Sequence, residues 1–246
     1  MPSRPRMKDK KEPVSILRNL KSKECITMTT NNQTALTTET SIFPHTDDYF
    51  YIGDRKIRSV IKHNEPLVIE LENVLSDGEC DKLILFSQTQ NRLQRSKIGT
   101  SHQVNDIRTS SGMFFEHSEN ELISTIEQRV SAIMGIPLQH AEKLQILNYA
   151  PGQQYKDHYD YFTSPTKKAD NRISTLIMYL NDVEEGGETT FPKLNLSVPP
   201  RKGNALYFEY FYNDTSLNEL TLHAGLPVVK GEKWVATQWM RKQTVR

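Results

Sequence analysis

Two histidines and one aspartate occur in the second half of this 246-residue sequence in an order that suits metal binding. His158 and Asp160 are separated by one residue, and His223 follows later in the chain. Two imidazoles and one carboxylate cover one face of an octahedral iron(II) and leave the opposite positions open, as in non-haem iron oxygenases. Lys233, ten residues past His223, is the kind of residue that a dicarboxylate co-substrate needs. Together these residues predict an iron-dependent oxygenase.

A histidine and an aspartate two positions apart are weak evidence by themselves, because His45 and Asp47 have the same spacing. That pair lies in a polar segment, and we interpret it as a solvated loop. His158 lies instead in an aromatic-rich run, residues 154–162, which predicts a strand. Because residues i and i+2 of a strand point to the same face, His158 and Asp160 are expected to reach one ion.

The composition predicts one sizeable core and a reducing compartment. The chain is 36% hydrophobic, and no apolar run approaches the roughly 20 residues of a membrane span. Its two cysteines, Cys25 and Cys80, form neither a disulfide framework nor a thiolate metal site. We therefore expect a cytoplasmic protein without a membrane partner.

The first residues differ in charge from the rest. Residues 1–27 carry eight Lys/Arg against three acidic residues, and residues 28–45 are polar. A basic tail can bind nucleic acid, but a solvated extension is the simpler interpretation and no nucleic-acid partner is predicted. The predicted organisation is a disordered polar, basic extension over 1–45 and a single domain over 46–246.

Helices are predicted before the strand-rich part. After an expected strand at 67–71, Ser76 and Glu79 form a capping box that opens one helix. Ser118 and Glu121 form a second box, which opens a helix with a regular apolar stripe. The stripe predicts packing against a sheet.

Short strands separated by turn residues follow. The predicted strands are 144–149, 154–162, 173–180, 188–191, 204–212, 220–224 and 233–241. This order predicts a mainly β protein with flanking helices (α+β), a jelly-roll barrel buttressed by N-terminal helices. Alternation along the last strand places Lys233 and Trp239 on the same face. The polar segments 95–112 and 163–171 are expected to be loops that close over a substrate.

Several ordered blocks resemble one family. They are His158-Tyr-Asp160, the run from Met178 to Pro192, Pro200-Arg-Lys-Gly203, His223-Ala-Gly225 and Gly231-Glu-Lys233-Trp234. The sequence from about Pro66 to Arg241 is similar to the prolyl 4-hydroxylases, iron(II)/2-oxoglutarate dioxygenases, and most similar to their short bacterial members. The resemblance implies a double-stranded β-helix of the cupin-like, jelly-roll kind.

The resemblance also assigns roles to residues. Iron would be held by His158, Asp160 and His223. The distal carboxylate of 2-oxoglutarate would be held by Lys233, with Tyr149 and Thr189 as hydroxyl donors. Contacts to the substrate peptide are implied for Arg108, Ser110, Glu142, Tyr155, Arg172 and Trp239.

The expected activity is hydroxylation of peptidyl proline at C4 with iron(II), dioxygen and 2-oxoglutarate, releasing succinate and CO2. No side chain can activate that carbon by itself, so the chemistry must come from the metal and oxygen. Further expectations from the resemblance are ascorbate support, a proline-containing peptide or protein substrate, such as a collagen-like one, and a homodimer. Two alternatives stay open: another substrate, such as a free amino acid, a lysyl side chain or a nucleobase, and a non-enzymatic module that responds to 2-oxoglutarate or oxygen.

Overall fold

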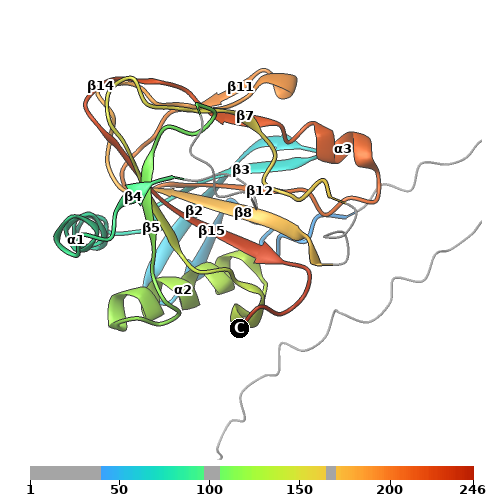
Figure 1. Cartoon of the computed structure of the whole chain (residues 1–246). Helices are drawn as coiled ribbons and strands as arrows, with labels where there is room; N and C mark the ends of the chain where they lie inside the picture. Colours follow the sequence, from blue (N-terminus) through green and yellow to red (C-terminus); the bar gives the residue numbers. More distant parts are fainter. Residues whose placement is uncertain (1–39, 97–105, 165–169) are drawn as a thin grey trace, which may run out of the picture. The chain divides into compact units, whose positions relative to one another are not determined.

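Two antiparallel sheets share an apolar cluster in the computed structural model, which describes residues 40–96, 106–164 and 170–246 (Figure 1). The nine-stranded sheet has the order β1-β2-β3-β12-β8-β15-β6-β5-β4, and the four-stranded sheet the order β11-β10-β13-β7. A third sheet pairs β14 with β9. This architecture confirms the predicted mainly β, jelly-roll fold with flanking helices.

The bounds of the elements follow the chain. The larger sheet contains β1 (Tyr49–Ile52), β2 (Arg55–Asn64), β3 (Leu67–Glu72), β4 (Gln94–Arg95), β5 (Ser111–Phe114), β6 (Gln145–Tyr149), β8 (Arg172–Tyr179), β12 (Ala205–Glu209) and β15 (Lys233–Arg241). The smaller sheets contain β7 (Tyr155–His158), β9 (Glu185–Gly186), β10 (Thr189–Phe191), β11 (Leu196–Val198), β13 (His223–Gly225) and β14 (Val228–Lys230). The helices are α1 (Asp77–Thr89), α2 (Glu121–Met134) and α3 (Thr215–Glu219), with 3-10 turns at Leu138–His140 and Pro192–Leu194.

Strand alternation divides the interior into two apolar clusters. Along β8, Leu176 and Met178 belong to the cluster on the helix side, whereas Tyr179 belongs to the cluster between the two sheets. On β12, Tyr207 and Phe208 divide in the same way. Successive side chains of a strand point to opposite faces, so the larger sheet is covered on both of its faces.

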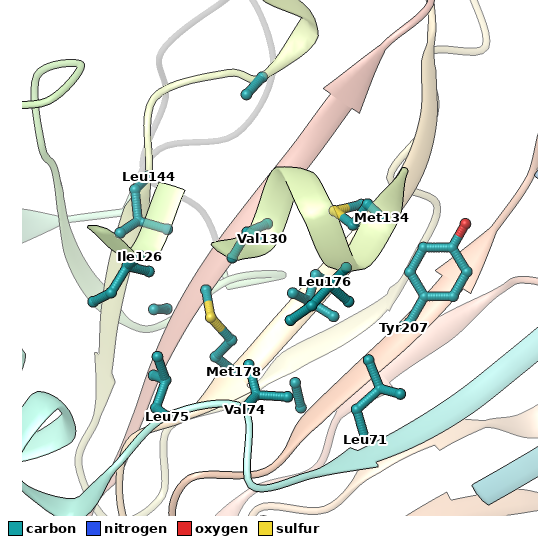
Figure 2. Packing of buried hydrophobic residues seen from close by; sticks show 14 of the residues in the cluster. Leu71, Val74, Leu75, Ile126, Val130, Met134, Leu144, Leu176, Met178 and Tyr207 are labelled. Atoms are coloured by element: carbon teal, nitrogen blue, oxygen red, sulfur yellow. The ribbon is translucent and has the colours of Figure 1, made fainter. Parts of the chain in front are cut away.

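Helix α2 covers the first of these faces. Ile126, Val130 and Met134 lie along one side of the helix and pack toward Leu176 and Met178 of the sheet (Figure 2). Each of these five side chains is at most 1% exposed, and complete burial of such a side chain stabilises the fold by about 1.5–3 kcal/mol. The predicted packing of this stripe against a sheet is confirmed, and it makes the larger sheet a rigid support for the opposite face.

The two predicted helix starts had different outcomes. The box of Ser76 and Glu79 is present, since the Ser76 side chain accepts from the Glu79 amide and Glu79 accepts from the Ser76 amide. The second box was wrong: Asn120 is the N-cap of α2, and its side chain accepts from the Ile123 amide. Ser118 instead donates from its amide and hydroxyl to the buried Glu127 carboxylate, which draws it away from the helix end.

The strand predicted at 154–162 was too long. β7 ends at His158, and Asp160 lies in the bend that follows. A hydrogen bond of 3.2 Å from Arg172 Nη1 to the Asp160 carbonyl holds that bend. His158 and Asp160 therefore do not share the face of one strand, although both reach the same point.

Packed residues begin before Thr46. Phe43 is 8% exposed and its ring lies 4.7 Å from that of Tyr207, while the Ile42 amide donates to Glu209. The predicted loop around Asp47 is present and Asp47 is exposed, although the His45 ring is only partly exposed and stacks on Phe50 at 3.7 Å. Strands β1 and β2, which follow, were also not predicted. Within the described residues, no helix is long and apolar enough to cross a lipid bilayer.

Candidate active site

Neighbouring strands of the smaller sheet bring the two histidines together. His158 ends β7, His223 begins β13, and the two residues are register partners. Asp160 Oδ1 lies 3.6 Å from His158 Nε2, and Asp160 Oδ2 lies 3.7 Å from His223 Nε2. One side-chain atom of each residue falls within 4.8 Å of the others, so the three residues can hold one ion.

Hydrogen bonds fix the orientation of both imidazoles. His158 Nδ1 lies 2.8 Å from the Lys156 carbonyl, and His223 Nδ1 lies 3.0 Å from the Thr221 carbonyl. Because a carbonyl oxygen only accepts, each Nδ1 carries the proton and each Nε2 presents a lone pair. Those lone pairs face the carboxylate oxygens of Asp160. With neutral rings, these acceptors face one another and a cation between them removes their repulsion, so the donor set fits a divalent metal.

The protonation states agree with metal binding. Burial, together with the neighbouring His158, lowers the pKa of His223 from 6.5 to about 4. Burial acts to raise the pKa of Asp160, but His223, His158 and Arg172 outweigh it and hold that pKa well below its usual range. At neutral pH, His223 is thus neutral and Asp160 ionised, which are the forms that coordinate metals.

A cavity of about 50 Å³ lies beside the three ligands. It is lined by Arg108, Leu147, Tyr149, Tyr155, His158, Asp160, Ile177, Thr189, His223, Gly225, Lys233, Val235, Thr237 and Trp239. Lys233 and Trp239 line it together, as the alternation along β15 predicts. Its lining combines aliphatic and aromatic side chains with several polar and charged ones.

Lys233 is a buried cation in this cavity. Its residue is 4% exposed, its ammonium lies 5.8 Å from the Tyr149 ring and 5.7 Å from the Tyr179 ring, and no carboxylate of the described residues lies within ion-pair distance of it. Burial lowers its pKa to about 8, against a smaller opposing effect of Glu188. A buried ammonium without a counter-ion favours an anionic ligand.

The Thr189 hydroxyl is prepared to donate a hydrogen bond. Tyr179 OH donates to Thr189 Oγ1 at 2.9 Å, which leaves the Thr189 proton for another acceptor. Tyr149 is the register partner of Lys233 on β6, so its side chain lies on the same face of the sheet. This part of the cavity thus offers the Lys233 ammonium and hydroxyl donors to a carboxylate.

Comparison with known proteins agrees with this donor set. Residues 144–241 match a family described as the 2OG-Fe(II) oxygenase superfamily. A probable prolyl 4-hydroxylase 3 of Arabidopsis thaliana is 40% identical over 200 residues, which are 72% of this chain and 69% of the relative. The chain belongs to the prolyl 4-hydroxylase family.

Solved structures extend the likeness to the fold. The viral collagen prolyl hydroxylase of Paramecium bursaria Chlorella virus-1, determined as a complex with 2-oxoglutarate, is 33% identical with a TM-score of 0.58, covering 71% of this chain and 95% of the viral one. A prolyl 4-hydroxylase of Pseudomonas putida is 19% identical with a TM-score of 0.54, covering 71% of this chain and 92% of its own. At that identity, the second likeness concerns the fold alone.

Three residues predicted to contact the substrate of a prolyl 4-hydroxylase line the cavity: Arg108, Tyr155 and Trp239. Arg108 pairs with Tyr155 across an isolated β-bridge, and its guanidinium lies 4.9 Å from the Tyr155 ring. Arg108 Nε and Trp239 Nε1 are buried and have no hydrogen-bond partner within the described part of the chain. Orphaned donors beside a cavity favour a ligand that carries acceptors.

The other three predicted substrate residues do not line the cavity. The Ser110 hydroxyl is buried and lies 2.8 Å from that of Ser96. Arg172 makes a two-pronged ion pair with Glu142, at 2.7 and 2.8 Å, and its guanidinium stacks 3.9 Å from the Trp239 ring. In the structure, the Glu142–Arg172 pair therefore lies behind Trp239. Parts of the two predicted substrate loops, residues 97–105 and 165–169, lie outside the described residues.

Sequence reasoning missed three residues around the site: Thr175, Tyr179 and Tyr210. Thr175 donates to Asp160, and Tyr210 contacts Thr175. Thr175 and Tyr179 are four residues apart on β8, so they face the same side as the cavity residue Ile177. This alternation was the only available signal, and it does not distinguish a site residue from a core residue.

Proposed function

We propose that this protein hydroxylates C4 of proline residues in peptides, with iron(II), dioxygen and 2-oxoglutarate. The carrying observation is one cavity that joins the three-ligand centre to the unpaired Lys233, in a chain that is 40% identical to a probable prolyl 4-hydroxylase. Iron, when bound, would activate dioxygen, of which one oxygen atom enters succinate as 2-oxoglutarate loses CO2 and the other becomes the hydroxyl group on carbon.

The residues of the chain hold and orient the reactants. His158, Asp160 and His223 would hold the metal. Lys233 would pair with the distal carboxylate of 2-oxoglutarate, to which Tyr149 and Thr189 would donate hydrogen bonds, offsetting the hydration that this carboxylate loses. The apolar residues of the cavity exclude water. Dioxygen would then react only with the part of the substrate that fits into the remaining space.

The substrate would lie against the aromatic residues at the cavity. Tyr155 and Trp239 offer apolar faces to a pyrrolidine ring, and the orphaned N–H groups of Arg108 and Trp239 suit peptide carbonyls. A polyproline II segment is already extended and loses little entropy on binding, so collagen-like or proline-rich peptides are the proposed class. Glu142 and Arg172 would contribute to substrate binding indirectly, by holding the Trp239 ring in place. Ser110 would also contribute indirectly, through its hydrogen bond to Ser96.

One incubation tests the proposed activity. The protein, iron(II) and 2-oxoglutarate are combined with (Pro-Pro-Gly)n, a proline-rich peptide without glycine repeats, a lysine-containing peptide or free proline. Succinate and the mass of each substrate are then measured. A gain of one oxygen on a prolyl peptide is expected. Oxidation of free proline or lysine alone would contradict the peptidyl-proline assignment, and 2-oxoglutarate binding without any turnover would leave the non-enzymatic alternative.

The affinity for 2-oxoglutarate should depend on pH through Lys233. Its pKa is about 8 in the ligand-free protein, and pairing with a carboxylate favours the charged form and raises it. The dissociation constant should therefore be constant below pH 8 and increase above it, by up to about tenfold per pH unit. Anaerobic titration of the iron(II) protein on both sides of this pH measures it. Lys233→Arg is the control, since a guanidinium stays charged and its dissociation constant should not change over the range; equal profiles for both proteins would refute the assignment.

We propose that the polar, basic residues before Thr40 are dispensable and that the domain needs the residues from there on. A chain that starts at Glu39 should keep its melting temperature and turnover. Removal through His45 deletes the buried Phe43 and should lower the free energy of unfolding by about 3–5 kcal/mol, as should Phe43→Ala. Thermal and denaturant unfolding measure both. An unchanged stability after removal through His45 would show that Phe43 contributes nothing.

Three further properties are proposed. Ascorbate should support turnover, as in the family that the sequence resembles. The protein should act in the cytoplasm, which is supported by only two cysteines, of which Cys80 is free and buried. A homodimer is expected from the bacterial relatives and would be measured by light scattering. Neither nucleic acid nor a membrane is proposed as a partner.

A further inference from the structure

A chain of two hydroxyl groups lies behind the carboxylate of Asp160. The Thr175 hydroxyl on β8 is 2.7 Å from Asp160 Oδ2, and it is 2.9 Å from the hydroxyl of Tyr210. Thr175 is fully buried and Tyr210 is 4% exposed, so water does not compete for these bonds. Neither residue belongs to the metal ligands or to the 2-oxoglutarate contacts proposed above.

The direction of each proton follows from the donors available. Asp160 is ionised and only accepts, so the single Thr175 proton must point to Oδ2. Thr175 then has only its lone pairs left for Tyr210, and the Tyr210 hydroxyl must donate to it. Burial raises the pKa of Tyr210 well above 10, so this hydroxyl keeps its proton. The chain therefore has one polarity, from Tyr210 through Thr175 to Asp160.

The backbone of Asp160 is held separately. Arg172 Nη1 donates to the Asp160 carbonyl at 3.2 Å, and Arg172 is itself fixed by its ion pair with Glu142. The position of Asp160 therefore does not depend on Thr175. What Thr175 adds is the orientation of the carboxylate. Oδ1 and Oδ2 lie 3.6 and 3.7 Å from the Nε2 atoms of His158 and His223, and the short, charge-assisted bond from Thr175 occupies a lone pair of Oδ2 only.

That orientation decides how many positions a metal keeps open. An octahedral ion has six positions, of which the three side chains take three and chelating 2-oxoglutarate takes two. One position is then left for dioxygen, provided that Asp160 binds through one oxygen only. On the basis of the proposed function, we propose that Thr175, oriented by Tyr210, keeps Asp160 a one-oxygen ligand and thereby preserves the position for dioxygen. Thr175 is a positioning residue.

Nitric oxide is a suitable probe, since it occupies the dioxygen position of iron(II) and gives an EPR signal without turnover. The wild type, loaded anaerobically with iron(II) and 2-oxoglutarate, is titrated with nitric oxide. Thr175→Val removes the donor at nearly constant volume and should weaken nitric oxide binding about tenfold or more. Thr175→Ser keeps a hydroxyl and should restore binding. Ser174→Ala removes a buried hydroxyl from the other face of β8 and should leave the titration unchanged.

A double variant separates positioning from a structural effect. Thr175→Val leaves the buried Tyr210 hydroxyl without its acceptor and so lowers stability. Thr175→Val with Tyr210→Phe removes that orphan and should recover melting temperature but not nitric oxide binding. Recovery of both would overturn the proposal, as would equal nitric oxide affinity in the wild type and Thr175→Val.

The outcomes also distinguish this proposal from the proposed activity. Wild-type protein that binds nitric oxide on iron(II) but leaves prolyl peptides unchanged would refute the substrate assignment only. Loss of the difference between Thr175→Val and the wild type would refute the positioning role only. A wild type that binds neither iron(II) nor 2-oxoglutarate would refute both.

Discussion

Replacing Asp160 by alanine is expected to abolish hydroxylation and to weaken iron(II) binding by more than about 100-fold, beyond the loss typical of residues outside the ligand set. The reason is that only two neutral imidazoles remain, and no carboxylate offsets the charge of the ion. The fold should persist, because Asp160 lies in a bend outside the strands and is not a member of either apolar cluster. Iron content, succinate release and a melting curve measure the three effects.

The sequence contains a matched control for this variant. Asp47 belongs to the other His-x-Asp pair, is exposed, and lies outside every strand. Asp47→Ala should retain iron content and turnover. Full activity in Asp160→Ala would remove Asp160 from the ligand set, and loss of activity in Asp47→Ala would show that aspartate removal acts indirectly.

Replacing Lys233 by alanine is expected to raise the 2-oxoglutarate concentration needed for half-saturation by roughly 30-fold or more. A buried carboxylate that loses its charged partner costs about 2–5 kcal/mol, and about 1.4 kcal/mol corresponds to a factor of ten. Lys233 is buried and has no carboxylate within ion-pair distance in the described part of the chain, so its ammonium is available to the co-substrate. Half-saturation is read from succinate release at varied 2-oxoglutarate.

Two smaller changes calibrate that effect. Thr189→Val removes one neutral donor, worth about 0.5–1.5 kcal/mol, and should raise half-saturation by less than about 15-fold. Lys233→Arg should fall between the two, because a planar fork replaces a compact ammonium. Lys230→Ala is the control for charge alone, since that side chain is 70% exposed and paired with Glu184. An unchanged half-saturation in Lys233→Ala would require another cation for the co-substrate.

Much of the fold could be predicted from residue pattern because it depends on local periodicity. The apolar stripe of α2 and the alternation of β15 are repeated over many residues, so single exceptions do not obscure them. Strand ends were less predictable: β7 stops at His158 because Arg172 holds the Asp160 carbonyl. β2 carries too many basic residues to read as a strand, and β1 has only four residues. The cap of α2 was mispredicted because Ser118 donates to Glu127, which lies in the middle of the helix. The spacing of residues at the start of the helix does not indicate this hydrogen bond.

The sequence by itself determined the identity of the candidate metal ligands and the buried cation. Their chemistry is a property of residue type, and the order His158, Asp160, His223 and Lys233 is visible without coordinates. It also determined that Lys233 and Trp239 face the same way, because strand alternation needs no tertiary information. These features do not depend on where the strands end.

Only the tertiary structure decided which other side chains act on those residues. Thr175 is 15 residues from its partner Asp160 in the chain, and Tyr210 is 35 residues from its partner Thr175. Tyr179 bonds to Thr189, which lies on another strand. Hydrogen bonds between distant segments depend on register and on sheet packing, which no local pattern encodes. The same is true of Ser110, whose hydroxyl pairs with Ser96, and of Glu142, which binds Arg172 behind Trp239. A polar residue reads alike in sequence whether it faces a ligand or another side chain, and the packing of the sheets decides between the two.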